Sequence, residues 1–299
     1  MQKIIPHLWF DKEAVEAANF YTSAFKDSAI IKKVTLRDTP SGDTDLVTFK
    51  LMGQEFMAIS AGPYFKPNAA ISFMVACDTT EEVDRLWDIL IQGGEAMMEK
   101  AEYPFSKNYG WVKDKYGFTW QIMHDGGMPV QKITPSLMFA GPKAGSARKA
   151  MELYTSVFPN SGPLEGEGHI SEYGEAAQAP DKPDMLQYAR FKIYGQELVV
   201  MDSAYEHQFD FNESVSLLVN CDTQEEIDAY SNALSAVPEA EQCGWIKDQF
   251  GVSWQMNPSI MNDIMSSSDQ VAVDRATRAF LKMKRFDIQK LKDAYEGKA

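Results

Sequence analysis

The sequence predicts an α+β fold of four β-α-β-β-β modules in two tandem halves, followed by a helical tail. Two observations predict it: a long internal repeat, and the order of strand-like and helix-like patterns within each half. The segment GWVKDKYGFTWQ at residues 110–121 returns as GWIKDQFGVSWQ at residues 244–255, with seven of twelve positions identical. The offset of 134 residues is close to half of the 299-residue chain. A period this long indicates two domains rather than a solenoid of short repeats.

Other segments recur at similar offsets: residues 3–10 with 132–139, 21–25 with 154–158, 53–55 with 195–197, and 77–82 with 221–226. We therefore expect domains at residues 1–130 and 131–264 and a tail at residues 265–299. The offsets first rise, because of insertions in the second half, and then fall, because a stretch around residues 96–106 occurs only in the first half. An acidic insert rich in Gly, Pro and Ala, at residues 165–184, occurs only in the second half and predicts a loop.

The first module begins with an apolar strand at residues 4–10, with His7 in its middle. Residues 13–25 then place apolar side chains at the spacing of an amphipathic helix. Three strand-like runs follow at residues 29–36, 46–52 and 55–60, separated by Pro, Gly and Asp turn residues.

The same order then starts again. Residues 70–77 read as a strand, and Asp78 or Thr79 can cap a helix that runs to about Leu90 before two glycines. Strands are expected near residues 96–100, 110–113 and 118–123. Asp114 and Asp248 lie in corresponding turns, where we expect them to cap backbone groups rather than act as bases.

The tail differs from both repeats. Residues 266–269 can cap a helix with Val271, Ala272, Ala276, Ala279, Phe280 and Met283 on one side, and a short helix at 288–294 follows. We expect this tail to pack back on a barrel; an independent partner-binding helix is the alternative.

Composition narrows the classes of partner. The formal charge of −14 disfavours nucleic acid and anionic membranes, which would repel the chain. No apolar run approaches a membrane span, and no secretory signal is visible. Three cysteines without metal-finger spacing suit a reducing cytoplasm. Cys77 and Cys221, at the ends of apolar strands, are expected to be small buried hydrophobes.

The paired modules and the Gly-Trp-x-x-Asp-x-x-Gly-x-x-Trp-Gln segments resemble the vicinal oxygen chelate superfamily (glyoxalases, bleomycin resistance proteins and dioxygenases). Within it, the chain resembles the PhnB-like group, whose domain carries the label 3-demethylubiquinone-9 3-methyltransferase. Residues 221–228, 242–248, 253–255 and 283–288 carry this resemblance best. The resemblance implies two tandem barrels, each a half-open barrel of two modules around one cleft. A fused pair would then be a covalent pseudo-dimer, and further homodimerisation is an open alternative.

The resemblance also implies one divalent metal per site, held by ligands from the first and last strands of the modules. In the first half these positions are His7 and Gln121, the candidate metal ligands; in the second half they are Ser136 and Gln255. The remaining expected positions, near Ala58 and Ala70 or near Val200 and Ser214, offer no convincing donor. A chelating site needs about three protein ligands, so we expect no cofactor, with a divalent metal as the alternative.

Several of these residues also have a structural explanation. His7 can be a polar residue that lines the cleft. Each glutamine follows a tryptophan in a strand, so the two side chains of a pair point to opposite faces, and either can face the cleft. Trp111 and Trp245 are expected to anchor the core or a domain interface.

Three classes of function remain. The first is a binding protein for a small aromatic or amphipathic molecule in one cleft, with catalysis left open. The second is a metal-dependent lyase, isomerase or dioxygenase. The third is the methyltransferase of the label, which finds no support in a glycine-rich strand-to-helix turn, because no Gly-x-Gly-x-x-Gly occurs.

The two clefts are expected to differ, since the first half has His7 where the second has Ser136. The candidate cleft residues are His7, Trp9, Trp120, Gln121, Ser136 and Gln255. We expect a ligand to prefer the first cleft, near His7, Trp9, Trp120 or Gln121.

Overall fold

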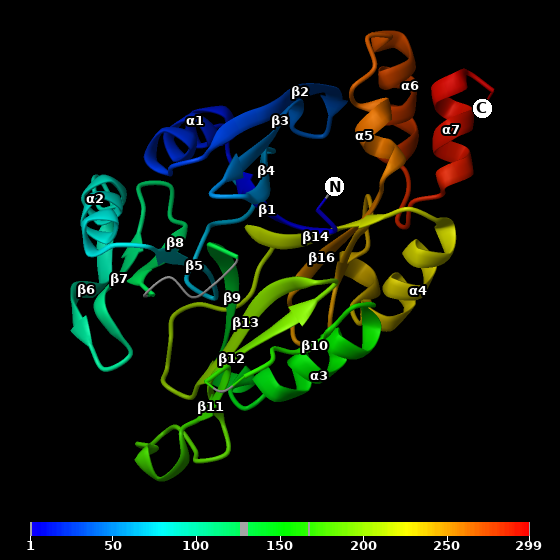
Figure 1. Ribbon diagram of the computed structural model, residues 1–299. Coiled ribbons are helices and arrows are strands. Elements are labelled where there is room, and N and C mark those ends of the chain that lie inside the picture. Colours follow the sequence, from blue (N-terminus) through cyan, green and yellow to red (C-terminus); the bar gives the residue numbers. More distant parts are fainter. Residues whose placement is uncertain (1, 126–130, 167, 299) are drawn as a thin grey trace.

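The computed structural model describes residues 2–125, 131–166 and 168–298, and its secondary structure follows the four-module order (Figure 1). The first half contains β1 (Ile4–Phe10), α1 (Ala14–Ala24), β2 (Ala29–Thr39), β3 (Gly42–Leu51) and β4 (Gln54–Ser60), then β5 (Ile71–Cys77), α2 (Thr80–Leu90), β6 (Glu95–Tyr103), β7 (Ser106–Lys113) and β8 (Thr119–His124). The second half contains β9 (Ile133–Ala140), α3 (Ala147–Val157), β10 (Gly162–Pro163), β11 (Ile170–Glu172), β12 (Leu186–Ile193) and β13 (Gln196–Ser203), then β14 (Val215–Cys221), α4 (Gln224–Leu234), β15 (Trp245–Lys247) and β16 (Ser253–Pro258). The tail forms α5 (Ile260–Ile264), α6 (Gln270–Phe280) and α7 (Ile288–Glu296).

The two sheets do not follow the two halves of the sequence. One sheet has the order β15-β16-β14-β1-β4-β3-β2, which joins the first module to the fourth. The other has the order β10-β12-β13-β9-β5-β8-β7-β6, with β11 beside β12, which joins the second module to the third. The expectation that His7 and Gln121 of one half share a cleft is therefore wrong. The first half-barrel, built on the first sheet, combines the first and fourth modules, and the second half-barrel, built on the second sheet, combines the second and third modules.

Antiparallel pairing of the modules' first strands joins the halves. In the first sheet β1 runs antiparallel to β14, with His7 opposite Ser216. In the second sheet β5 runs antiparallel to β9, with Ser72 opposite Ser136. These strands lie inside their sheets, so each pairs with a strand of the other half on one side and with a strand of its own half on the other.

The modules within one half meet through their outer, helix-covered faces. The rings of Phe56 on β4 and Phe73 on β5 lie 5.2 Å apart, and Trp120 lies 5.1 Å from Phe73. These residues are fully buried members of one core that runs through all four modules. This core therefore holds together the two modules of each half, whereas each sheet joins two modules from different halves.

Strand alternation decides which side chains face the concave side of the first sheet. On β1, Leu8 and Phe10 belong to the large core. Ile5 belongs to a separate cluster with Met57 and Leu218. Since successive side chains of a strand point to opposite faces, His7 and Trp9 share the concave face with Ile5.

The tail packs back on the first half-barrel, as expected from its apolar side. Helix α6 lies against α7 and against β2, as Figure 1 shows in orange and red. The chain after α6 is hydrogen-bonded to the turn before β15: Cys243 N donates to Met283 O and Gly244 N donates to Lys284 O, both at 2.8 Å. No helix among the described residues is long and apolar enough to cross a membrane.

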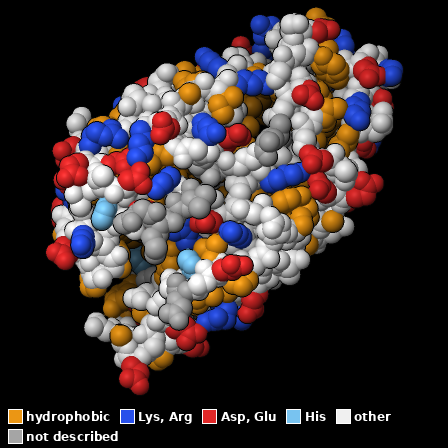
Figure 2. All heavy atoms as spheres, in the orientation of Figure 1, with side chains coloured by type: hydrophobic (Ala, Val, Ile, Leu, Met, Phe, Trp, Pro, Cys, Tyr) orange, Lys and Arg blue, Asp and Glu red, His pale blue; other side chains and the backbone are white. Residues whose placement is uncertain are grey.

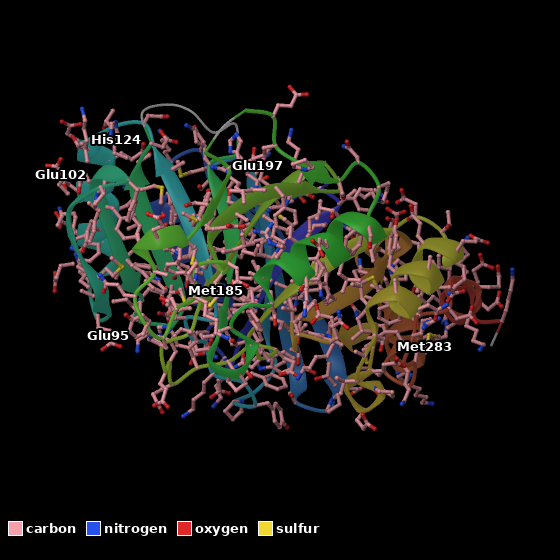
Figure 3. The ribbon with its side chains drawn as sticks, turned by 90° about the horizontal axis from the view of Figure 1, so that it is seen from below. Glu95, Glu102, His124, Met185, Glu197 and Met283 are labelled. Carbon is pink, nitrogen blue, oxygen red and sulfur yellow. The ribbon has the colours of Figure 1, made fainter. Side chains whose placement is uncertain are left out.

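The two unique stretches take different forms. Residues 95–113 form the β6–β7 hairpin at the far end of the second sheet. Figure 3 shows Glu102 and His124 at this end of the molecule and Met283 of the tail at the opposite end. The insert at residues 165–184 was predicted as a loop, but its described residues include β11 and a 3-10 turn at Gly174–Ala176, because β11 pairs with β12.

Candidate functional site

A row of four side chains crosses the concave face of the first sheet. Thr48 on β3 pairs with Met57 on β4, Met57 pairs with His7 on β1, and His7 pairs with Ser216 on β14. Pairing in register places the four Cβ atoms side by side on one face. Gln255 on β16 reaches this row, because its Nε2 donates to Ser216 Oγ at 2.8 Å.

Thr48, Met57 and His7 of this row, together with Gln255, line a cavity of about 540 Å³. Most of its lining is aromatic or aliphatic and comes from three places: the concave sheet, the loop after β4, and the tail. The principal apolar residues are Trp9, Val34, Leu36, Leu46, Ile59, Tyr64, Phe65, Leu218, Trp245, Met261, Met265, Phe280, Leu281 and Phe286. Figure 2 shows a recess with hydrophobic side chains between β2–β3 and α5–α6, where the molecule is hollowed. The tail thus forms one wall of the cavity.

His7 lines the cavity and is almost fully buried, at 2% exposure. Its Nδ1 has no hydrogen-bond partner among the described residues. The ring stands edge-on to Trp245, with centroids 5.7 Å apart. Burial lowers the pKa of His7 to about 3, so the imidazole is neutral at physiological pH. A neutral imidazole has one donor and one acceptor nitrogen, so it can bind an uncharged polar group but brings no charge.

The side-chain amides of Gln255 and Asn257, which also line the cavity, already make hydrogen bonds within the protein. Gln255 donates to Ser216, and Asn257 Nδ2 donates to Asn220 Oδ1 at 3.1 Å. No described residue donates to the Gln255 Oε1 atom, which leaves an acceptor at this end of the cavity. The polar end of the site therefore consists of uncharged groups.

Two charged side chains also line the cavity. Glu213 is paired with Lys247, with 2.6 Å between Oε1 and Nζ. Lys32 on β2 donates from Nζ to Asn262 O at 3.2 Å and to Ser266 Oγ at 2.6 Å. Both of these acceptors are uncharged and lie at α5 and just after it.

The corresponding row of the second sheet has different chemistry. Arg190 pairs with Val199, Val199 with Ser136, and Ser136 with Ser72. Arg190 forms an ion pair with Glu197, and both side chains are largely buried. The larger, paired side chain of Arg190 therefore stands where the first sheet has Thr48.

Gln121 lies in this second sheet, and its polar atoms are satisfied there. Tyr109 Oη donates to Gln121 Oε1 at 2.9 Å, and Gln121 Nε2 donates to Ser72 Oγ at 2.8 Å. Ser136 is almost fully buried beside it, and its Oγ has no partner among the described residues. Gln121 and Ser136 share the concave face of the second sheet rather than the cavity.

The six predicted cleft residues thus separate into three places. His7, Trp9 and Gln255 line the cavity together. Gln121 and Ser136 lie on the second sheet, whereas Trp120 is fully buried in the core, where its Nε1 donates to Asp114 Oδ2 at 2.8 Å. Trp120 does not face the cavity, and the alternation of the strand explains why: its neighbour Gln121 takes the concave face.

Sequence reasoning missed the contribution of the tail and of β2–β3 to the site. Met261, Met265 and Phe280 read as the apolar face of helices, a pattern that does not say which surface they cover. Trp245 was expected in the core or an interface, and the structure places it on the cavity wall.

The donor set does not fit the divalent metal that the fold family implies. The positions that face one another are His7, Met57, Ser216 and Gln255, which offer one imidazole, a thioether, a hydroxyl and an amide. A divalent ion in such folds needs about three nitrogen or carboxylate ligands. Among the described residues, no three His, Cys, Asp or Glu side chains gather where they could hold a metal ion.

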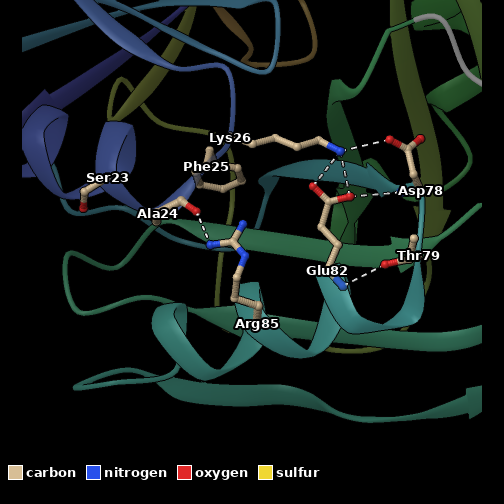
Figure 4. Close-up of a pocket in the computed structure, with 8 residues that line it drawn as sticks. All are labelled: Ser23, Ala24, Phe25, Lys26, Asp78, Thr79, Glu82 and Arg85. Carbon is tan, nitrogen blue, oxygen red and sulfur yellow. Dashed lines mark hydrogen bonds and ion pairs between the residues drawn. The ribbon is translucent and has the colours of Figure 1, made fainter.

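A second depression lies between the end of α1 and the start of α2 (Figure 4). Its charged side chains contact the protein: Lys26 pairs with Asp78 and Glu82, and Arg85 donates to the carbonyl of Ala24 at 2.7 Å. Thr79 caps α2 by accepting from Glu82 N. These contacts hold the end of α1 against the start of α2.

Comparison with known proteins agrees with this architecture. The family model described as 3-demethylubiquinone-9 3-methyltransferase matches residues 2–123 and again residues 131–257. The PhnB protein from Bacillus cereus, which carries the same methyltransferase description, is 40% identical and is covered completely, over 42% of this chain, with a TM-score of 0.39. A protein from Staphylococcus aureus is 33% identical over 42% of this chain and 97% of its own, with a TM-score of 0.18.

A longer structural match covers both repeats. Glyoxalase I from Zea mays is 12% identical, over 88% of this chain and 96% of its own, with a TM-score of 0.51. A search of curated proteins found no match. The expected family is confirmed by the family model, and the expected glyoxalase-like fold class by the match to glyoxalase I. The chain therefore belongs to the family described as 3-demethylubiquinone-9 3-methyltransferase, of which it carries two PhnB-like copies in a glyoxalase-like fold.

Proposed function

We propose that this protein binds one small, largely apolar molecule in the cavity between the first and fourth modules. The observation that supports this most directly is an apolar cavity of about 540 Å³ lined by His7, whose buried Nδ1 has no hydrogen-bond partner among the described residues. A buried polar atom without a hydrogen bond costs about 1–3 kcal/mol. A ligand that supplies a hydroxyl, carbonyl or amide beside His7 would recover that cost.

The size and lining of the cavity support a small-molecule ligand. Ligand pockets are typically about 300–1,000 Å³, mostly apolar, with a few well-placed polar groups. Here the apolar wall is built by Trp9, Trp245 and the tail, and the polar groups gather at His7 and Gln255. The concave face of the second sheet instead carries the largely buried Arg190–Glu197 ion pair. We infer from this difference that the ligand binds in the first half-barrel.

The alternative functions have less support. A metal-dependent lyase, isomerase or dioxygenase would need a donor set that the His7 row does not provide. The methyltransferase reading rests on the family description, and no glycine-rich nucleotide turn accompanies it. We place the protein in the cytoplasm, since its three cysteines are free, and expect no nucleic acid partner because of its charge of −14.

The proposal is tested by filling the cavity. Thr48→Trp places a large ring on the His7 row, whereas Lys50→Trp lies on the same strand at an exposed position outside the cavity. The neutral fluorescent probe N-phenyl-1-naphthylamine is expected to bind wild type at one saturable site. Thr48→Trp should weaken this binding by about tenfold or more, and Lys50→Trp by less than about twofold. Absence of saturable binding to wild type, or equal binding to both variants, would refute the proposal.

A further inference from the structure

Lys32 lies at the rim of the cavity and has no ion-pair partner among the residues that the structure describes. It lies on β2, the edge strand of the first sheet, and its side chain is half-buried against α5. An ammonium group has three donors. Asn262 O and Ser266 Oγ take two of them, and both acceptors are uncharged. One donor and the whole positive charge remain for another partner.

No carboxylate among the described residues lies within 4.0 Å of the Lys32 ammonium. The other charges nearby are satisfied: Glu213 in the cavity pairs with Lys247, and Lys33, the next residue on β2, pairs with Asp45 at 3.2 Å. Asp263 acts on Lys32 only through space. Burial is the larger effect and lowers the pKa of Lys32, so the folded protein holds this charge at a cost that an anion would offset.

The two ends of the cavity therefore differ in charge. The inner end has the neutral His7 imidazole and the Gln255 amide, and the rim has the Lys32 ammonium. Apolar side chains from the sheet and from the tail, such as Leu46, Met265 and Phe280, line the space in which both ends stand. This arrangement matches a molecule with an apolar body and one acidic group.

Resting on the proposed binding function, we infer that the natural ligand is an amphipathic monoanion whose acidic group is held by Lys32 at the rim. Its apolar body fills the cavity, and an uncharged polar group, where present, meets His7. A carboxylate, a sulfonate or a phosphate ester would satisfy the same contact, because each offers several acceptor oxygens to the free donor. An uncharged apolar molecule would bind without the contribution from the rim.

Matched pairs of probes test this inference by titration calorimetry at low salt. The first pair is 2-naphthoate and 2-naphthylmethanol, and the second, of different shape, is decanoate and decanol. Each anion is expected to bind wild type about tenfold tighter than its alcohol, since a half-exposed charge-assisted hydrogen bond is worth about that factor. Lys32→Gln should remove this preference and leave the alcohols unchanged. Lys32→Arg should keep it.

Lys33→Gln is the matched control, because it removes a neighbouring charge that the protein already pairs with Asp45. It should change no affinity by more than about twofold. Thermal unfolding of each variant checks that the contact with α5 survives. Equal affinity of anion and alcohol in wild type, or an equal loss for both in Lys32→Gln, overturns the inference and leaves the binding function intact. If neither pair binds, the proposed function fails and this inference fails with it.

Discussion

The hydroxyl of Tyr21 donates a 2.7 Å hydrogen bond to Oδ2 of Asp114, and both groups are fully buried. This bond joins α1 of the first module to the turn before β8 of the second. Tyr154 and Asp248 repeat it at 2.7 Å in the second half. Asp114 Oδ1 also accepts from the backbone N–H groups of Tyr116 and Phe118, so the expected capping role of this turn carboxylate is confirmed.

Removing the tyrosine hydroxyl in either half should destabilise the protein by a similar amount. Tyr21→Phe and Tyr154→Phe each leave a buried carboxylate with one donor fewer, which costs about 1–3 kcal/mol. Urea unfolding measures the change. Tyr116→Phe is the control, because its hydroxyl bonds to the exposed Glu16 and its loss should cost less than about 0.5 kcal/mol. A change as small as the control in both buried variants would contradict the assigned role.

Stability should depend on His7 below neutral pH. The folded-state pKa of His7 is about 3, below the ordinary 6.5, so unfolding takes up a proton between these values. Its contribution is therefore fully present above about pH 6.5 and is lost as the pH falls. Between pH 7 and pH 4.5 the free energy of unfolding of wild type should fall by about 2–3 kcal/mol more than that of His7→Gln, at about 1.36 kcal/mol per pH unit. Parallel pH profiles of the two proteins would show that His7 titrates normally.

The packing of the tail against the turn before β15 should depend on Gly244. Its φ is +78°, and an added Cβ would lie 2.5 Å from the Phe286 ring and 2.9 Å from the Met256 carbonyl oxygen. Gly53 has a φ of +93° with nothing within 4 Å of the same position, so Gly53→Ala measures the backbone strain alone. Gly244→Ala should cost about 1–3 kcal/mol more in unfolding free energy. It should also speed proteolysis within residues 266–298, and equal behaviour of the two variants would argue against this contact.

The two repeats should not fold as independent monomers. Residues 1–130 alone would leave β1 without β14 and β5 without β9, so two inner strands would become exposed edges. We expect this fragment to self-associate, and co-expression with residues 131–299 to give a soluble one-to-one complex. Size-exclusion chromatography with light scattering reports both. A monomeric fragment that unfolds cooperatively by itself would contradict the shared sheets.

Probe binding should not depend on a metal. The residues facing His7 are Met57 and Ser216, which are poor partners for a divalent ion beside a single imidazole. Extended dialysis against a chelator should leave the affinity for N-phenyl-1-naphthylamine unchanged. Near-stoichiometric zinc, nickel, iron or manganese that copurifies with wild type and is lost in His7→Ala would overturn this prediction.

Local features of the fold could be predicted from the sequence, whereas the pairing of one module with another could not. The modules, the turn at Asp114 and the capping of α2 by Thr79 depend on residues close together along the chain. The partnership of His7 with Gln255 instead depends on which module pairs with which. Both arrangements satisfy the same strand alternation, because the first strands of all four modules are short, largely buried apolar runs. Only the packing between modules decides between them.

The correspondence of Gly53 with Gly195 places Thr48 and Arg190 at equivalent positions, where one leaves space and the other fills it with an ion pair to Glu197. A dimer of identical single repeats could not hold this difference, because its symmetry would copy every substitution into both clefts. Joining the copies in one polypeptide lifts that constraint. Each cleft is then free to acquire its own chemistry, with the ratio of the two fixed at one to one by the peptide bond between them.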